Sequence, residues 1–223
     1  MQPQEAIDLL VLHCYTLGSV VSNNKGVTSM KTSTARLTFM DVAIPRTGFL
    51  WDAALVIGFA CLTAICAQIS FWVGMVPVTG QTFGVILAGA LLGSRRGALS
   101  QLSYLAVGAT GIPYWFALGG PPGIARLAGP TGGYLIGFVA AAFVVGWLAE
   151  RGWDRRVWTA IPAMLAGSIV FYVFGLPWLA HFVPEGTVLQ AGLYPFIIGD
   201  LGKTAAAALA LPSGWLLLQR LKG

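Results

Sequence analysis

Long apolar stretches, separated by short polar segments, make up most of the chain after residue 50. A helix needs about 20 apolar residues to cross the hydrocarbon core of a bilayer, and about 17 is the lower limit. Six stretches reach this length, and in chain order they cover residues 51–73, 75–93, 97–113, 134–150, 157–175 and 194–219. We therefore predict an all-α integral membrane protein with six transmembrane helices.

Two other parts of the chain do not follow this pattern. Residues 1–45 mix polar and apolar positions and carry Glu5 and Asp8 near their start, where a secretory signal has basic residues. We predict that residues 1–45 are a poorly ordered N-terminal extension and that residues 46–223 form the six-helix transmembrane domain. The connection 111–133 is too rich in glycine and proline for a regular helix.

The composition agrees with a membrane protein. The chain is 57% hydrophobic and only 9% charged, whereas soluble domains carry about 25% charged residues. Most of the surface is therefore expected to face lipid. The three cysteines, Cys14, Cys61 and Cys66, form no C-x-x-C motif, and we expect neither a disulfide framework nor a metal cluster from them.

The distribution of basic residues predicts the topology. Six spans would place both termini on one side of the membrane, and that side would hold eleven of the thirteen basic residues: Lys25, Lys31, Arg36, Arg46, Arg95, Arg96, Arg151, Arg155, Arg156, Arg220 and Lys222. By the positive-inside rule this side is cytoplasmic. We expect a multi-pass protein of the cell inner (plasma) membrane, whose net charge of +5 reflects topology and not binding of nucleic acid.

Two basic residues lie elsewhere, and they are the first candidates for a functional site. Arg126 lies in the outer connection, and Lys203 lies in the last span, three residues after Asp200. Residues at this spacing share one face of a helix. A charge at the bilayer centre costs about 2.5–3.5 kcal/mol on insertion scales, so such groups face the bundle interior and mark functional sites. The alternatives are a purely structural Asp200–Lys203 ion pair and an ordinary surface arginine at 126.

Aromatic and small residues have more than one interpretation. Five aromatic residues fall in the outer third of the predicted bundle: Tyr114, Trp115, Tyr134, Trp178 and Tyr194. They fit the aromatic belt at the membrane interface, or some of them line an apolar pocket. On the first span, small residues such as Ala60 and Ala64 share one face, which favours close approach of another helix. That helix belongs either to a partner or to the same bundle.

Several common motifs of enzyme sites are absent from the sequence. A phosphate-binding loop would need glycine at Ile197, and neither His13 nor His181 forms H-E-x-x-H. A G-x-S-x-G nucleophile motif is missing. Asp52 and Asp200 would lie at opposite sides of the bilayer and could not share a proton. We expect no catalytic residues, no metal and no cofactor, and an integral membrane enzyme using Asp200 as acid or base stays an alternative.

Three segments of the chain resemble the BioY family, the biotin-specific S components of energy-coupling factor (ECF) vitamin transporters. They are "VPVTGQTFGVILAGALLGSRRGALS", "LAGPTGGYLIGF" and "YPFIIGDLGKTAAAALALP". The resemblance runs from Leu50 to Leu218 in the right order and spacing, and residues 1–45 lie outside it. It implies that residues 46–223 are a substrate-binding domain with the S-component fold, open to the outside.

The resemblance also implies roles for individual residues. The G-D-x-x-K motif of the last helix corresponds to Gly199, Asp200 and Lys203 and contributes to the ligand pocket. From these motifs together with the candidates Arg126 and Trp115 named above, the expected substrate-binding residues are Asp200, Lys203, Arg126, Gln81, Thr82, Tyr134 and Trp115, with Pro77 and Thr79 in a gating loop. Ala60 and Ala64 correspond to a small-residue contact with the transmembrane coupling subunit.

The chemistry of biotin fits these residues. Asp200 could accept hydrogen bonds from the ureido N–H groups, while Lys203 donates to the ureido oxygen and neutralises Asp200. Arg126 could meet the acid tail or the ureido oxygen. Because the chain has no nucleotide-binding motif, energised uptake would require the coupling subunit and two ATPase subunits. An S component for a different vitamin is the second alternative.

Overall fold

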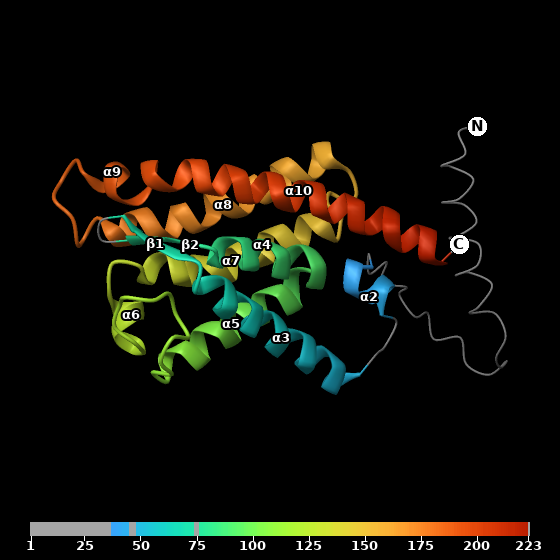
Figure 1. Cartoon of the computed structure of the whole chain (residues 1–223), viewed down its shortest axis with the longest axis horizontal. Helices are drawn as coiled ribbons and strands as arrows, with labels where there is room; N and C mark the ends of the chain where they lie inside the picture. Colours follow the sequence, from blue (N-terminus) through green and yellow to red (C-terminus); the bar gives the residue numbers. More distant parts are fainter. Residues whose placement is uncertain (1–36, 45–47, 74–75, 223) are drawn as a thin grey trace, which may run out of the picture. The chain divides into compact units, whose positions relative to one another are not determined.

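The computed structural model describes residues 37–44, 48–73 and 76–222, which belong to one compact unit. Its elements are the helices α2 (Phe39–Ala43), α3 (Phe49–Ala67), α4 (Gln81–Leu92), α5 (Ser94–Ala109), α6 (Ile124–Ala128), α7 (Gly132–Ala149), α8 (Val157–Leu179), α9 (Val188–Gly192) and α10 (Tyr194–Lys222), and the strands β1 (Ser70–Val73) and β2 (Val76–Thr79) (Figure 1). Residues 1–36 of the predicted extension lie outside the described residues.

The predicted all-α membrane class is confirmed by long apolar helices. Among the described residues, four segments are long and apolar enough to cross a membrane: Phe49–Ala67, Gly132–Ala149, Val157–Leu179 and Val188–Leu221. Helix α4 has 12 residues and rises only about 18 Å, against a hydrocarbon core of about 30 Å. The prediction of six crossings with both ends in the cytoplasm therefore stays a prediction.

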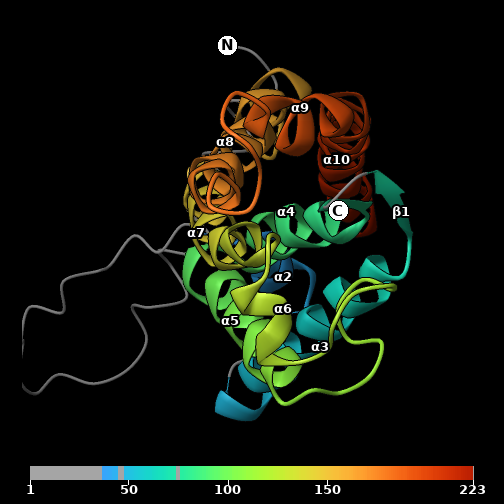
Figure 2. The same cartoon turned by 90° about the vertical axis from the view of Figure 1, so that its left-hand side faces the viewer.

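The helices of this unit pack in three layers. Helices α4 and α7 lie in the middle, with α3 and α5 on one side and α8 and α10 on the other (Figure 2). Small residues allow the close approach: a side chain at Gly97 of α5 would lie 2.9 Å from the Cα atom of Gly89 in α4. Membrane helices associate through such backbone contacts because lipid gives them no hydrophobic drive to pack.

A glycine also forms the tight turn between α4 and α5. Gly93 has φ 84°, a left-handed backbone that favours glycine. Beyond it, the Glu150 carboxylate at the end of α7 accepts hydrogen bonds from the backbone N–H and the hydroxyl of Ser94, at 2.7 and 2.8 Å. These bonds join the middle layer to the start of α5.

A β-hairpin corrects the predicted ends of the first two spans. The sequence placed residues up to 73 in the first helix and residues from 75 in the second, but 70–73 and 76–79 pair as antiparallel strands. Short apolar runs do not distinguish a strand from a helix. Pro77 has no N–H to continue a helical hydrogen-bond ladder. The indole N–H of Trp72 fixes the hairpin by donating to the carbonyl of Leu118 at 2.8 Å.

Helix α2 occupies the last part of the predicted extension. Thr38 and Asp41 form a capping box at its start, and Arg96 of α5 pairs with Asp41 and, at 3.1 Å, with Asp52. Burial alone would raise the pKa of Asp41, but hydrogen bonds from Arg96 and Thr38 outweigh it and lower that pKa. Helix α2 is thus attached to the transmembrane domain by charge as well as by packing.

Candidate ligand-binding pocket

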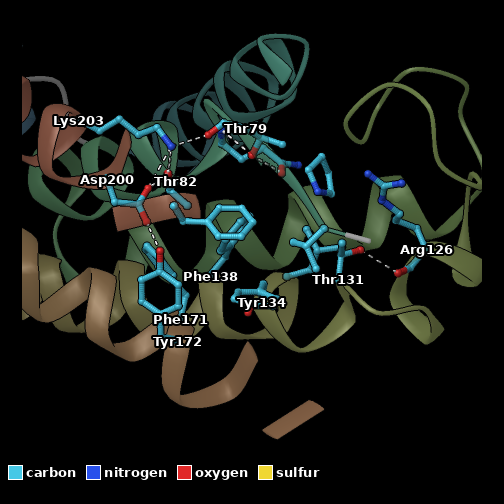
Figure 3. Close-up of a pocket in the computed structure, with 15 residues that line it drawn as sticks. Thr79, Thr82, Arg126, Thr131, Tyr134, Phe138, Phe171, Tyr172, Asp200 and Lys203 are labelled. Carbon is cyan, nitrogen blue, oxygen red and sulfur yellow. Dashed lines mark hydrogen bonds and ion pairs between the residues drawn. The ribbon is translucent and has the colours of Figure 1, made fainter. Parts of the chain in front are cut away.

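A pocket lies where the hairpin, α4, α6, α7, α8 and α10 meet (Figure 3). Its lining combines aromatic rings with a few polar and charged side chains: Val76, Pro77, Thr79, Gln81, Thr82, Arg126, Thr131, Tyr134, Leu135, Phe138, Phe171, Tyr172, Phe196, Asp200 and Lys203. An apolar wall with a few convergent polar groups is typical of a small-molecule site.

One end of the pocket carries the ion pair of α10. The Lys203 ammonium lies 3.0 Å from Oδ1 of Asp200, and the spacing of three residues places both on one face of the helix. Lys203 also donates to the hydroxyl of Thr82 at 2.9 Å and to the carbonyl of Thr79 at 2.6 Å. The predicted pairing of the two charges inside the bundle is confirmed.

Asp200 is held by further hydrogen bonds. Its side chain accepts from the hydroxyl of Thr82 at 3.3 Å on Oδ1 and from the hydroxyl of Tyr172 on Oδ2. The residue is only 8% exposed, so these donors replace the water that a carboxylate would otherwise bind. The cluster of Asp200 and Lys203 has no net charge.

Arg126 lies at the other side of the pocket, on α6 (Figure 3). It is 5% exposed, and the alternative of an ordinary surface arginine is therefore wrong. Its Nη2 donates to the carbonyl of Ala117 at 3.3 Å, and its guanidinium lies 5.5 Å from the centre of the Trp72 ring. Within the described part of the chain, no acidic side chain forms an ion pair with it.

The Arg126 guanidinium keeps its charge in this position. Burial lowers its pKa from the ordinary arginine value, and the nearby Tyr104 opposes that effect. Arginine nevertheless stays protonated in proteins because its unperturbed pKa is so high. Among the described residues, the pocket thus has a neutral polar cluster at one end and, at the other, a positive charge without a carboxylate partner.

A polar network connects the start of α4 to the hairpin. Gln81 is 6% exposed, and its Oε1 accepts a hydrogen bond from the hydroxyl of Thr79 at 2.9 Å. The Nε2 atom of Gln81 donates to the hydroxyl of Tyr104 in α5. Four residues predicted from the P-x-T-x-Q-T segment therefore line the pocket together: Pro77, Thr79, Gln81 and Thr82.

The aromatic wall between the two ends comes from α7, α8 and α10. Tyr134, predicted from the sequence, lines it and donates its hydroxyl to the carbonyl of Gly192 at 2.9 Å. The sequence pattern did not identify Phe138, Phe171 and Phe196 as pocket residues, because a phenylalanine in an apolar span resembles any other core residue. Tyr172 was not identified either, since a tyrosine near a span end fits the aromatic belt equally well.

Two predicted contacts lie away from the pocket. Trp115 is not among the lining residues; instead it stacks on Tyr104, with ring centres 6.0 Å apart. Ala60 and Ala64 are 2% and 8% exposed and belong to the internal core. Within the chain they contribute to a core that α3 shares with α4 and α5, and their assignment to a partner interface stays a prediction.

Comparison with known proteins gives the family. A sequence model described as "BioY family" matches residues 30–220, which is most of the chain. The chain belongs to the BioY family. The "Probable biotin transporter BioY" of Pyrococcus horikoshii is 43% identical over 158 residues, covering 71% of this chain and 92% of the relative. The "Biotin transporter BioY" of Rhizobium etli is 39% identical over 166 residues, covering 66% and 88%.

The BioY fold is also found in a solved structure. The crystal structure at 2.1 Å of the S-component for biotin from an ECF-type ABC transporter matches with a TM-score of 0.63 and 26% identity. The match covers 78% of this chain and 91% of the other. The predicted S-component-like fold is confirmed. BioY membership also makes this chain a multi-pass membrane protein of a transporter family and not an enzyme that uses Asp200.

Proposed function

We propose that this BioY protein is the biotin-binding membrane subunit of an ECF-type vitamin uptake transporter. The observation that carries the proposal is the charge arrangement of the pocket. A neutral Asp200–Lys203 cluster and a buried Arg126, which has no carboxylate partner in the described part of the chain, lie at opposite sides of an aromatic wall. Biotin has the complementary layout, with a neutral ureido ring at one end and a carboxylate at the other.

The charges also support one orientation of biotin. The ureido ring would lie at Asp200 and Lys203, because its N–H groups and its carbonyl can be bonded there without adding net charge. The acid tail would lie at Arg126, where a carboxylate neutralises the buried guanidinium. The thioether ring would pack on Phe138 and Phe171, which line the wall between the two ends.

The hairpin is proposed as the gate over this site. Strand β2 contributes Pro77 and Thr79 to the lining, and the carbonyl of Thr79 accepts a hydrogen bond from Lys203 at 2.6 Å. A movement of the hairpin would therefore break a contact to the ammonium that is proposed to meet biotin. This links opening of the gate to the polar end of the pocket.

The remaining assignments concern the assembly. We propose six crossings, both ends in the cytoplasm and a place in the inner (plasma) membrane, which the sorting of basic residues supports. A transmembrane coupling subunit and two ATPase subunits would supply the energy. Without them, a subunit that only binds biotin could equilibrate or retain it but not accumulate it.

Calorimetric titration of the purified, ligand-stripped protein with biotin tests the proposal. We expect tight binding near one biotin per chain and a rise in melting temperature. Folded protein that neither binds biotin nor is stabilised by it would refute the proposal. A screen of other vitamins would then test the alternative of an S component with a different substrate.

A further inference from the structure

Tyr104 is a buried polar residue that contacts the pocket lining without belonging to it. It lies on α5, is fully buried and is not a lining residue. Its hydroxyl accepts a hydrogen bond from Nε2 of Gln81, and Gln81 does line the pocket. Tyr104 is therefore connected to the pocket through Gln81.

Hydrogen bonds continue from Gln81 to the charged end of the pocket. The hydroxyl of Thr79 donates to Oε1 of Gln81 at 2.9 Å and accepts from the Gln81 backbone N–H at 3.3 Å. The carbonyl of the same Thr79 accepts from the Lys203 ammonium at 2.6 Å. A change in the position of Gln81 would therefore displace one of the oxygen atoms that hold Lys203.

Tyr104 is itself fixed by the outer connection. Its ring stacks on Trp115 at 6.0 Å with an angle of 27°, and it meets the edge of Phe116 at 5.4 Å with an angle of 89°. The indole N–H of Trp115 donates to the Tyr104 carbonyl at 2.8 Å. These contacts hold the Tyr104 ring against the outer connection.

We propose that Tyr104 is a positioning residue for ligand binding, which orients Gln81 and, through Thr79, sets the place of the Lys203 ammonium. The proposal rests on the proposed function, in which Lys203 meets the ureido ring of biotin. Tyr104 makes no contact with the ligand. The hydrogen bonds lead from Tyr104 through Gln81 and Thr79 to Lys203, at the ureido end of the pocket. Tyr104 also lies near Arg126, so the test separates an effect at the ureido end from one at the acid tail.

Tyr104→Phe tests this role, because it keeps the ring packing and removes the oxygen that accepts from Gln81. We expect titration of the purified variant to show binding of biotin weakened about two- to tenfold, as for the loss of one neutral hydrogen bond. Biotin methyl ester differs from biotin only at the tail, and its binding is expected to weaken by the same factor. A second variant, Gln81→Met, removes the same contact from the other side. When Tyr104→Phe is added to the Gln81→Met variant, the affinity for biotin is expected to change by less than about twofold from that of Gln81→Met alone.

Phe59→Leu is the matched control, since Phe59 is buried in a separate core cluster with Ala88 and Leu92. It is expected to lower the melting temperature and leave both affinities unchanged. Unchanged affinity in Tyr104→Phe, additive effects with Gln81→Met, or a loss for biotin but not for the ester would each overturn the positioning role. Wild-type protein that binds neither compound would refute the proposed function instead.

Discussion

Asp200 receives hydrogen bonds from three side chains of three different helices. Thr82 comes from α4, Tyr172 from α8 and Lys203 from α10 itself. A charge inside an apolar bundle is tolerated only when it is paired and hydrogen-bonded. The same cluster would also hold the helices together, so binding and stability must be measured separately.

Asp200→Asn is predicted to weaken biotin binding by at least about tenfold, because a hydrogen bond to a charged group contributes roughly 1.5–3 kcal/mol. Titration of the purified variant measures the loss. Asp52→Asn is the control, since that carboxylate is 52% exposed beside Arg96, and it should bind as the wild type does. Unchanged affinity with a lowered melting temperature would mean that Asp200 and Lys203 are purely a structural pair.

Arg126→Met is predicted to remove the preference for the free acid. The side chain keeps similar length and packing but loses the charge that would meet the carboxylate, so biotin should bind at least about tenfold more weakly. Biotin methyl ester should bind the variant and the wild type about equally. Competition titrations with the two compounds measure the ratio, and an equal loss for both would place Arg126 at the ureido ring.

At the scale of elements, the contact between α4 and α5 depends on glycine. A Cβ atom at Gly97 would lie 2.9 Å from the Gly89 Cα atom and 3.1 Å from the carbonyl oxygen of Ala88. Both are backbone atoms and can move only if the helices separate. The contact therefore fixes how closely the two short helices approach.

Gly97→Ala is predicted to destabilise the protein by about 1–3 kcal/mol, the usual cost of overpacking. Gly58→Ala is the matched control, because a Cβ atom there meets no atom within 4 Å. It should be neutral or stabilise by up to about 1 kcal/mol, since alanine has the higher helix propensity. Thermal unfolding in detergent compares the two, and equal melting temperatures would contradict the close packing.

Attachment of α2 is predicted to depend on pH. The pKa of Asp41 is lowered in the folded state, so its contribution is present above the unfolded value of about 3.9 and is lost as pH falls through the folded value. Asp41→Asn should therefore cost roughly 1 kcal/mol or less at pH 7, because the pair is partly exposed. The difference from wild type should vanish at low pH. A difference that persists there would show that the carboxylate charge is not its cause.

For the whole molecule, binding and accumulation are predicted to be separable. Proteoliposomes that contain this chain alone should bind biotin but never concentrate it, because the sequence carries no nucleotide-binding motif. Co-reconstitution with a coupling subunit and two ATPase subunits should give ATP-dependent accumulation. Labelled biotin measures binding and accumulation in both preparations. Concentrative uptake by the chain alone would contradict its assignment as the substrate-binding subunit of a larger transporter.

The sequence by itself determined the membrane class, the helical architecture and the charged pair. A run of about 20 consecutive apolar residues is typical of a transmembrane helix, so composition and run length are sufficient to assign the membrane class. The spacing of Asp200 and Lys203 defined a shared helix face without any tertiary information. The P-x-T-x-Q-T motif also identified four pocket residues, Pro77, Thr79, Gln81 and Thr82, because it resembles a known family.

Only the tertiary structure decided which residues meet. The sequence shows that Ala60 and Ala64 share a small-residue face of one helix. Whether that face turns inward depends on the position of α4 and α5. Trp115 and Tyr172 are both aromatic residues near predicted span ends, yet one packs behind Tyr104 and the other reaches Asp200. Periodicity gives the face of a helix, whereas the neighbour across that face is set by packing between segments far apart in the chain.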